Sequence, residues 1–394
     1  MQTFSVAKAT SAWLVIGLSA MACGGASSGP DGRGDAAPSP PVAAPLTVAE
    51  AAPRVAATWM ADTPAEEMEW DWGDGVLTFG LLELAEVSGE RRYRDYVERY
   101  VLHHQERGDE LEIYWSDHMT SALSAALLVQ RSDADVEPIL ERAIDYLMNR
   151  APRTEAGGIR HLGLFLPFFL ADLWVDSLFH ICPLLSRYSQ IRADPVYLDE
   201  AAAQLLIFAR VMQDPATGLI THGYAEETDS QVPAFAERAF WARGNGWMLA
   251  AMVDIRAQLG PEHPQRAELS ERLERLEGAL RALQDPDTGL FHTVLLDPET
   301  YVETAGSGLI VYAMARGVRL GLFGDDTDAA ARRGMDGLLA VLVTPDGGDP
   351  ERLEVGGISD ATLPVASTYA YIPQRRQLSY GVGAWLLAAS EYLR

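Results

Sequence analysis

Apolar residues recur at helical spacing through most of the chain after Val48, in segments separated by short turns rich in Gly, Pro and Asp. No long alternating run of β-branched residues competes with these segments. The pattern predicts an all-α protein with a few short hairpins at most. The expected helices span residues 75–84, 117–129, 136–149, 198–212, 246–259, 268–283, 305–320 and 380–393.

Two turn sequences repeat along the chain. The segment QDPATGL at 213–219 recurs as QDPDTGL at 284–290, each after a predicted helix and each followed by an apolar residue and a histidine. A weaker copy at 153–159 precedes His161. Such repetition indicates stacked helical hairpins, and about six of them closed into a ring make an (α/α)6 barrel. Its inner helices leave a concave end for a ligand.

The first 46 residues differ from the rest. Residues 1–23 carry a positive charge, a short apolar run and small residues before Cys23, which is the layout of a secretory signal. Cys23 also lies in a candidate bacterial lipobox, so it is either lipidated or incidental to ordinary cleavage. Residues 24–46 read as a flexible Gly/Pro/Ala linker and 47–394 as a single domain. We expect a periplasmic or lipid-anchored bacterial protein secreted across the inner membrane, attached to a membrane only through Cys23.

Charge and cysteine content exclude several classes. With 56 acidic and 31 basic residues the chain has a formal charge of −25 and no basic run, which argues against a nucleic-acid partner. Cys182 is the only cysteine after Cys23, so the predicted domain can form neither an internal disulfide nor a thiol-based metal cluster. We expect Cys182 to be a small buried thiol.

Loops at the predicted hairpin ends mix aromatic rings with hydrogen-bonding groups. Sugars are bound in this way, because flat rings cover their C–H faces while polar groups pair their hydroxyls. A single Trp is more often a core residue, and a single His more often satisfies loop carbonyls. A phosphate loop around Arg243 is disfavoured, since no Lys-Ser or Lys-Thr follows and no strand precedes it. The candidate substrate-binding residues are Trp72, His161, Trp174, His222, Trp241, Arg243, Asn245 and Trp247.

Two acids, Asp117 and Asp176, each follow a Trp closely and each enter an apolar helix pattern. A helix N-cap or a paired structural acid is the simpler interpretation of either residue. Paired carboxylates also suggest glycosidase chemistry, in which one acid keeps its proton in a poorly solvated pocket. We expect desolvation to raise the pKa of Asp176 and make it a general acid.

Several motifs together resemble glycoside hydrolase family 105, the unsaturated rhamnogalacturonyl hydrolases, and more distantly the unsaturated glucuronyl hydrolases of family 88. The resemblance runs from about Trp70 to the C-terminus. One departure is His180, where Met or another apolar residue is expected. The matching strings are WGDG at 72–75, WVDSLF at 174–179, HGY at 222–224, WARGNGW at 241–247, ETAGSG at 303–308 and YGVGAWLLAASE at 380–391.

The resemblance implies an (α/α)6 barrel with Asp176 as general acid and base and Asp117 as the second acid. The implied substrate is an oligosaccharide from a polysaccharide lyase, with a 4,5-unsaturated uronic acid at its non-reducing end. Protonation of C4 and addition of water at C5 would release the saturated sugar, with neither a metal nor an organic cofactor. Two alternatives remain: an (α/α)6 sugar epimerase or isomerase using a pair of histidines, and a non-catalytic surface carbohydrate-binding protein.

Overall fold

Pairs of helices follow one another along the chain, as the repeated turns predicted. The computed structural model describes residues 46–161, 172–226, 240–345, 349–362 and 365–394. The signal peptide predicted at 1–23, and the predicted linker apart from Leu46, lie outside these residues. Leu46–Arg394 is one compact unit, described here by itself.

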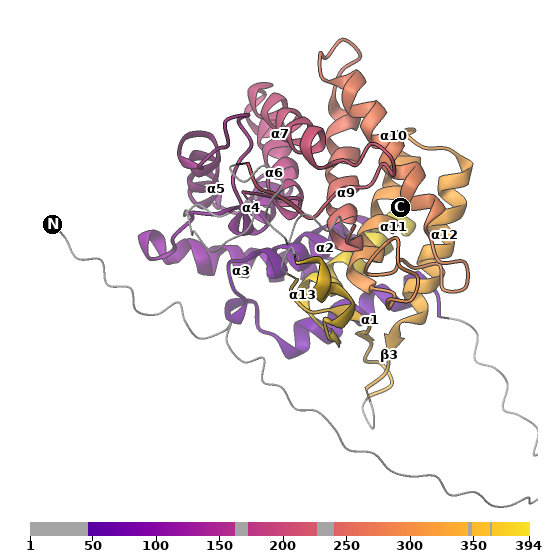
Figure 1. Ribbon diagram of the computed structural model, residues 1–394. Coiled ribbons are helices and arrows are strands. Elements are labelled where there is room, and N and C mark those ends of the chain that lie inside the picture. Colours follow the sequence, from indigo (N-terminus) through magenta and orange to yellow (C-terminus); the bar gives the residue numbers. More distant parts are fainter. Residues whose placement is uncertain (1–45, 162–171, 227–239, 346–348, 363–364) are drawn as a thin grey trace, which may run out of the picture. The chain divides into compact units, whose positions relative to one another are not determined.

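Within the described residues, six helices form an inner ring. Each contacts the next along the chain, and the last contacts the first, so the ring closes (Figure 1). These helices are α2 (Trp72–Ser88), α4 (Met119–Arg131), α6 (Asp176–Arg192), α9 (Ala242–Gln258), α11 (Thr304–Arg319) and α13 (Ser379–Tyr392).

A second layer of helices covers the outside of the ring. Each outer helix packs mainly against one inner helix, from α3 on α2 to α12 on α11, and α1 packs on α13. This architecture confirms the predicted all-α (α/α)6 barrel. The outer helices are α1 (Val48–Asp62), α3 (Arg91–Glu106), α5 (Glu137–Asp145), α7 (Val196–Met212), α10 (Arg266–Ala282) and α12 (Asp325–Ala340).

The inner helices approach one another closely at glycines. A Cβ atom on Gly383 of α13 would lie 2.5 Å from the carbonyl carbon of Val76 in α2, and one on Gly80 would lie 2.7 Å from the carbonyl oxygen of Gly383. No real side chain tolerates such contacts with rigid backbone. The close packing of the first and last inner helices therefore depends on these glycines.

Four helices, α1, α3, α6 and α12, were not among the expected helix ranges. The expected ranges agree with the observed helices within four residues at each end, with two instructive differences. The helix expected at 136–149 ends at Asp145, and the chain continues as one wider π turn, Tyr146–Arg150. The helix expected from 117 begins at Met119, because Asp117 lies in a preceding 3₁₀ turn, Ser116–His118. Further short turns are Ala65–Glu67, Gly108–Glu110 and Ala366–Tyr371.

The strands are short antiparallel pairs. The pairs are β1 (Leu173–Trp174) with β2 (Gly223–Tyr224), β3 (Leu342–Val343) with β4 (Glu354–Val355), and β5 (Ile358–Ser359) with β6 (Gln374–Arg375). In the first pair Trp174 lies opposite Gly223, which brings the start of α6 beside His222.

Buried ion pairs join the carboxyl ends of the inner helices. Glu83 of α2, Asp254 of α9 and Glu391 of α13 are almost fully buried there. Arg316 of α11 pairs with Asp254 and, at 3.1 Å, with Glu391. Arg394 pairs with Glu83 and, at 3.5 Å, with Glu391. Because each buried acid has a cationic partner, this charged cluster can lie buried at the carboxyl ends of the inner helices.

Cys182 is fully buried in α6, with its Sγ 3.5 Å from the carbonyl oxygen of Ala201, which confirms the predicted buried thiol. Among the residues that the structure describes, no helix has the length and apolar character needed to cross a bilayer.

Candidate active site

The predicted site residues gather at the amino ends of the inner helices. An outer helix returns the chain after each inner helix, so the inner helices share one direction and their amino ends share one face of the ring. Asp117 lies in the 3₁₀ turn just before α4, Asp176 is the first residue of α6, and Arg243 lies in the first turn of α9. Helix amino ends carry partial positive charge and favour nearby carboxylates.

Asp117 is held between two histidines in a nearly dry pocket. Its Oδ1 lies 3.6 Å from Nε2 of His161 and 3.9 Å from Nε2 of His180. Nδ1 of His161 lies within hydrogen-bond distance of the hydroxyls of Ser116, at 2.9 Å, and Ser177, at 3.0 Å. The serines thus fix the ring that faces the acid.

Asp176 is paired with a third histidine, which is itself held from behind. Oδ2 of Asp176 lies 3.1 Å from Nε2 of His222. Nδ1 of His222 lies 2.8 Å from the hydroxyl of Tyr369, and both side chains are buried. A hydroxyl that donates to Nδ1 favours Nε2 as a protonated nitrogen, and Nε2 is the atom that lies near Asp176. The result is a chain of polar contacts from Tyr369 through His222 to the acid.

The two acids have opposite ionisation preferences. Burial raises the pKa of Asp117 well above its usual range, and the charges of Asp176 and Asp71 raise it further. Burial also acts to raise the pKa of Asp176, but the charge and hydrogen bond of His222 lead the groups that outweigh it and lower this pKa to about 2. The surroundings therefore favour the protonated form of Asp117 and the ionised form of Asp176.

This outcome corrects the expectation that desolvation would raise the pKa of Asp176. Burial lowers the pKa of His161 to about 3 and that of His180 to about 4, so both rings are neutral at neutral pH. His222, 3.1 Å away, is the neighbour that favours the ionised form of Asp176. The expected direction of the Asp176 pKa rested on desolvation alone, because the sequence did not reveal this partner.

Two of the predicted aromatic residues stack on the histidines of the site. The ring of Trp174 lies parallel to His161, with centroids 4.3 Å apart and planes within 4°. Trp241 stacks on His222 at 4.3 Å. Both tryptophans are more than nine-tenths buried, so stacking on them fixes the orientation of the two histidine rings.

Trp72 and Trp247 form a separate aromatic group around His180. Trp72 is half-buried and lies 4.5 Å from the ring of Tyr380 and 6.4 Å from His180. Trp247 is fully buried and packs on Phe179 at 4.6 Å. Of these two, only Trp72 has surface available to cover a sugar, and the structure places Trp247 in the core.

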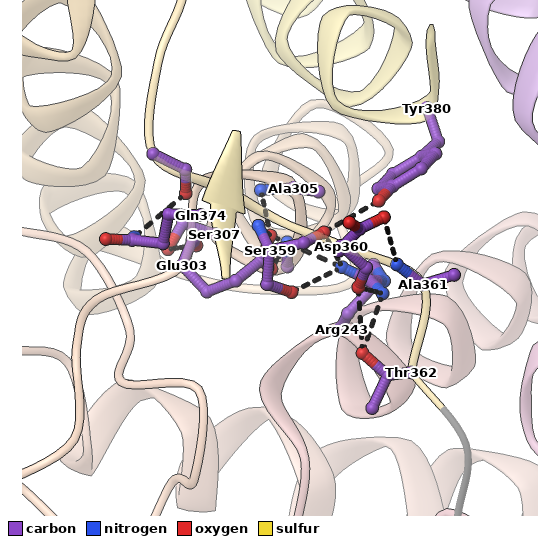
Figure 2. A network of polar contacts seen from close by, with 12 residues as sticks. Arg243, Glu303, Ala305, Ser307, Ser359, Asp360, Ala361, Thr362, Gln374 and Tyr380 are labelled. Atoms are coloured by element: carbon purple, nitrogen blue, oxygen red, sulfur yellow. Dashed lines mark hydrogen bonds and ion pairs between the residues drawn. The ribbon is translucent and has the colours of Figure 1, made fainter. Parts of the chain in front are cut away.

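The guanidinium of Arg243 is occupied by the protein itself, as Figure 2 shows. Its Nη1 donates to the hydroxyl of Ser359 at 2.8 Å and pairs with Glu303 at 3.4 Å. Its Nη2 donates to the carbonyl of Asp360 at 3.2 Å and the hydroxyl of Thr362 at 3.1 Å. The side chain is 1% exposed. The predicted contact of Arg243 with substrate is therefore replaced by a structural role: it anchors the segment 359–362 behind the site.

The side chain of Asn245 is also hydrogen-bonded within the protein. Its Oδ1 accepts from the backbone N–H of Ile220 at 2.8 Å, and its Nδ2 donates to the carbonyls of Ile220 and Trp241, each at 2.9 Å. With no exposed surface, Asn245 does not reach the cleft, contrary to the expected substrate contact. It instead fixes the turn that leads to His222.

Two residues of the site were not singled out in the sequence. Tyr369 contacts His222 from 147 positions away, and no motif links the two. Asp71 caps the amino end of α2 and influences Asp117 electrostatically. Burial, with the charge of Asp74, raises the pKa of Asp71 to about 7. The aromatic loop around Asp71 was the one signal that could have drawn attention to it. Within the described ranges, no group of three or more His, Cys, Asp or Glu is placed to hold a metal ion.

Comparison with known proteins gives a family match over most of the chain. The model of Glycosyl Hydrolase Family 88 matches residues 49–394. The unsaturated rhamnogalacturonyl hydrolase YesR of Bacillus subtilis is 24% identical over 330 residues, which cover 83% of this chain and 91% of that protein. An unsaturated 3S-rhamnoglycuronyl hydrolase of Alteromonas is 29% identical over 225 residues, 56% of this chain and 51% of its own length.

Solved structures give the same picture of the fold. A protein from Salmonella enterica, described as a possible member of the GH105 family, is 26% identical with a TM-score of 0.72 over 82% of this chain and 83% of its own. A family 105 glycoside hydrolase from C. acetobutylicum is 22% identical with a TM-score of 0.77 over 87% of this chain and 99% of its own. These similarities confirm the resemblance found in the motifs.

Proposed function

Because the chain belongs to glycosyl hydrolase family 88, we propose that it removes a 4,5-unsaturated uronic acid from the non-reducing end of oligosaccharides left by a polysaccharide lyase. The relative from B. subtilis, named for unsaturated rhamnogalacturonyl hydrolysis, supports this substrate class. The alignment with that protein covers 83% of this chain and 91% of that protein.

The single observation that carries the proposal is a pair of acids in unequal surroundings. Asp117 is almost fully buried, which favours its protonated form, while His222 lies 3.1 Å from Asp176 and favours its ionised form, so the pair suits proton donation and proton acceptance. Hydration of an enol ether needs both functions. Separate environments, set by burial at Asp117 and by His222 at Asp176, supply them.

In the reaction, the acid pair delivers its proton to C4 of the unsaturated uronate, and positive charge develops at C5 and the ring oxygen. Asp176, ionised and close to His222, takes a proton from the water that adds at C5. The product is a hemiketal at C5. Its C5–O bond to the ring oxygen breaks, the ring opens, and the saturated sugar leaves from C1. No covalent glycosyl-enzyme forms, and the pair again holds one proton.

The test follows loss of the enol-ether absorbance with an unsaturated disaccharide from a pectin or glycosaminoglycan lyase digest. The wild-type protein should consume it, while Asp176→Asn and Asp117→Asn should each lose at least about a hundredfold in kcat. Asp199→Asn, which changes an exposed acid on α7, is the matched control and should retain full activity. Unchanged absorbance with every common unsaturated uronide would refute the proposed hydrolase.

The histidine-based isomerase is the weaker alternative. His161 is buried with its pKa lowered to about 3, which makes it a poor base at neutral pH. His292, another histidine considered for that role, contacts the carbonyl of Thr300 and lies 3.4 Å from Asp285 in its own turn. Conversion of a saturated sugar to its epimer, followed by NMR, is the measurement that would favour this alternative. Binding without turnover would indicate a surface carbohydrate-binding protein.

The N-terminal sequence supports a further proposal on location. We propose that the protein is exported across the inner membrane and anchored by lipid at Cys23, with residues 24–46 as the tether. Mass spectrometry of the mature N-terminus tests this directly. A diacylglycerol-modified Cys23 supports the anchor, and an unmodified N-terminus or unchanged membrane association of Cys23→Ser contradicts it.

A further inference from the structure

A groove of about 620 Å³ opens beside the segment that leads to Asp117. Its lining includes Tyr114 on that segment and two arginines, Arg142 and Arg150, from α5 and the π turn after it. This volume lies within the range of small-ligand sites. Because α5 runs back toward the amino end of α4, its last turn and the groove lie at the same end of the ring as the acids.

Aromatic contacts connect the groove to the acid pair. Tyr114 is 41% exposed, which is unusual for a large aromatic ring beside a buried site. It stacks on Trp115, with centroids 5.9 Å apart and planes within 18°. Trp115 in turn lies 6.1 Å from the ring of His161, which faces Asp117. A continuous series of rings therefore leads from the acid out to the surface of the groove.

The charges of the groove favour a neutral ligand. Arg142 donates to the carbonyl oxygens of Gly108 and Leu111, and Arg150 pairs with Asp145 at 2.8 Å, so both guanidinium groups have acceptors already. By contrast, the exposed lining acids at positions 109 and 112 have no hydrogen-bond or ion-pair partner among the described residues. Carboxylates accept hydrogen bonds from sugar hydroxyls and repel a second carboxylate.

We propose that this groove is a binding subsite for neutral, saturated sugar residues on the leaving-group side of the cleaved bond, with Tyr114 as the platform on which one of them stacks. The inference rests on the proposed hydrolysis of unsaturated uronyl oligosaccharides and names where the rest of the oligosaccharide lies. A disaccharide substrate is too short to gain much from Tyr114. A longer substrate gains the stacking contact.

The kinetic test compares an unsaturated disaccharide with an unsaturated tetrasaccharide whose saturated residues are neutral. Tyr114→Ala should lower kcat/KM for the tetrasaccharide by about fivefold more than for the disaccharide, through KM. Tyr114→Phe, which keeps the ring, should behave as wild type. Leu320→Ala, which trims an exposed apolar residue after α11, is the control and should change neither substrate. Equal losses for both lengths, or no loss, would overturn the subsite.

A binding measurement separates this proposal from the proposed function. Titration calorimetry with a saturated neutral trisaccharide should show binding to the wild type that Tyr114→Ala weakens severalfold. If wild type hydrolyses no unsaturated uronide but still shows this Tyr114-dependent binding, the subsite stands and the hydrolase fails. If hydrolysis is normal and the trisaccharide does not bind, or a uronate-bearing one binds better, the neutral-sugar subsite is wrong.

Discussion

Replacing Arg243 by Met tests whether this residue is structural or binds substrate. Methionine has similar length but offers no hydrogen-bond donor, so Glu303 would lose its cationic partner while remaining fully buried. Leaving one partner of a buried ion pair behind costs about 3–5 kcal/mol. The hydroxyl and carbonyl acceptors of segment 359–362 would lose their donors as well.

For a domain of this size, 1 kcal/mol corresponds to about 2 °C in Tm. Arg243→Met should therefore lower the Tm by ~6–10 °C, measured by circular dichroism at 222 nm or by calorimetry. The double variant Arg243→Met with Glu303→Gln should recover part of this loss, because the glutamine carries no charge that needs a partner. The amide still accepts from the backbone N–H of Ala305, as Glu303 does at 3.0 Å.

The kinetic constants of the same variants decide between the two roles. If Arg243 acts only by holding the segment 359–362, Arg243→Met should lower the Tm whether or not substrate is present. A variant with an unchanged Tm and a KM raised tenfold or more would refute this reasoning. That result would restore the substrate contact that the sequence suggested.

Three further outcomes follow from the packing and charges. Asp71 has a folded-state pKa of about 7, against about 3.9 unfolded, so its contribution to stability is full below pH 4 and is lost as the pH rises through 7. Urea unfolding should show this decline in wild type but not in Asp71→Asn, which keeps the helix cap; parallel pH profiles would contradict it. Gly383→Ala should cost about 3 kcal/mol or more, since its Cβ would meet the backbone of Val76; a Tm within 2 °C of wild type would contradict it. Tyr369→Phe removes the hydroxyl that holds His222 and should lower kcat about tenfold with KM and Tm nearly unchanged, whereas an unchanged kcat would remove Tyr369 from the site.

Hydrophobic periodicity predicted the fold because every inner helix is long and separated by distinct turns. The repeated QDPxTGL turns indicated where hairpins lie. Their glycines, at positions 218 and 289, have positive φ angles that few other residues adopt, so this residue type marks a turn. Periodicity does not indicate which helices contact each other when they lie far apart in the sequence. The contact of α13 with α2 depends on glycine surfaces that do not appear in the apolar pattern.

The structure brings the two acids predicted from the sequence to the same end of the ring, but the sequence did not indicate their surroundings. Asp117 and Asp176 were recognisable as acids placed at the starts of apolar helices. Which of them keeps its proton depends on His222, whose distance to Asp176 is set by the pairing of β1 with β2. Arg243 has the residue type of a substrate contact, yet its direction is set by Ser359, far along the chain. The sequence contains the residues that interact, but it does not show how their side chains are oriented.

The buried charges at the carboxyl ends of the inner helices also bear on how the protein is made. Arg394, the last residue, reaches Glu83, which lies 311 positions earlier. The final helix α13 therefore completes both the packing of α2 and the neutralisation of an acid at its end. On a nascent chain, α2 keeps an open apolar side until α13 has been made. Completion of the ring is thus a late, long-range event, and a chain without α13 would leave α2 without one of its neighbours in the ring.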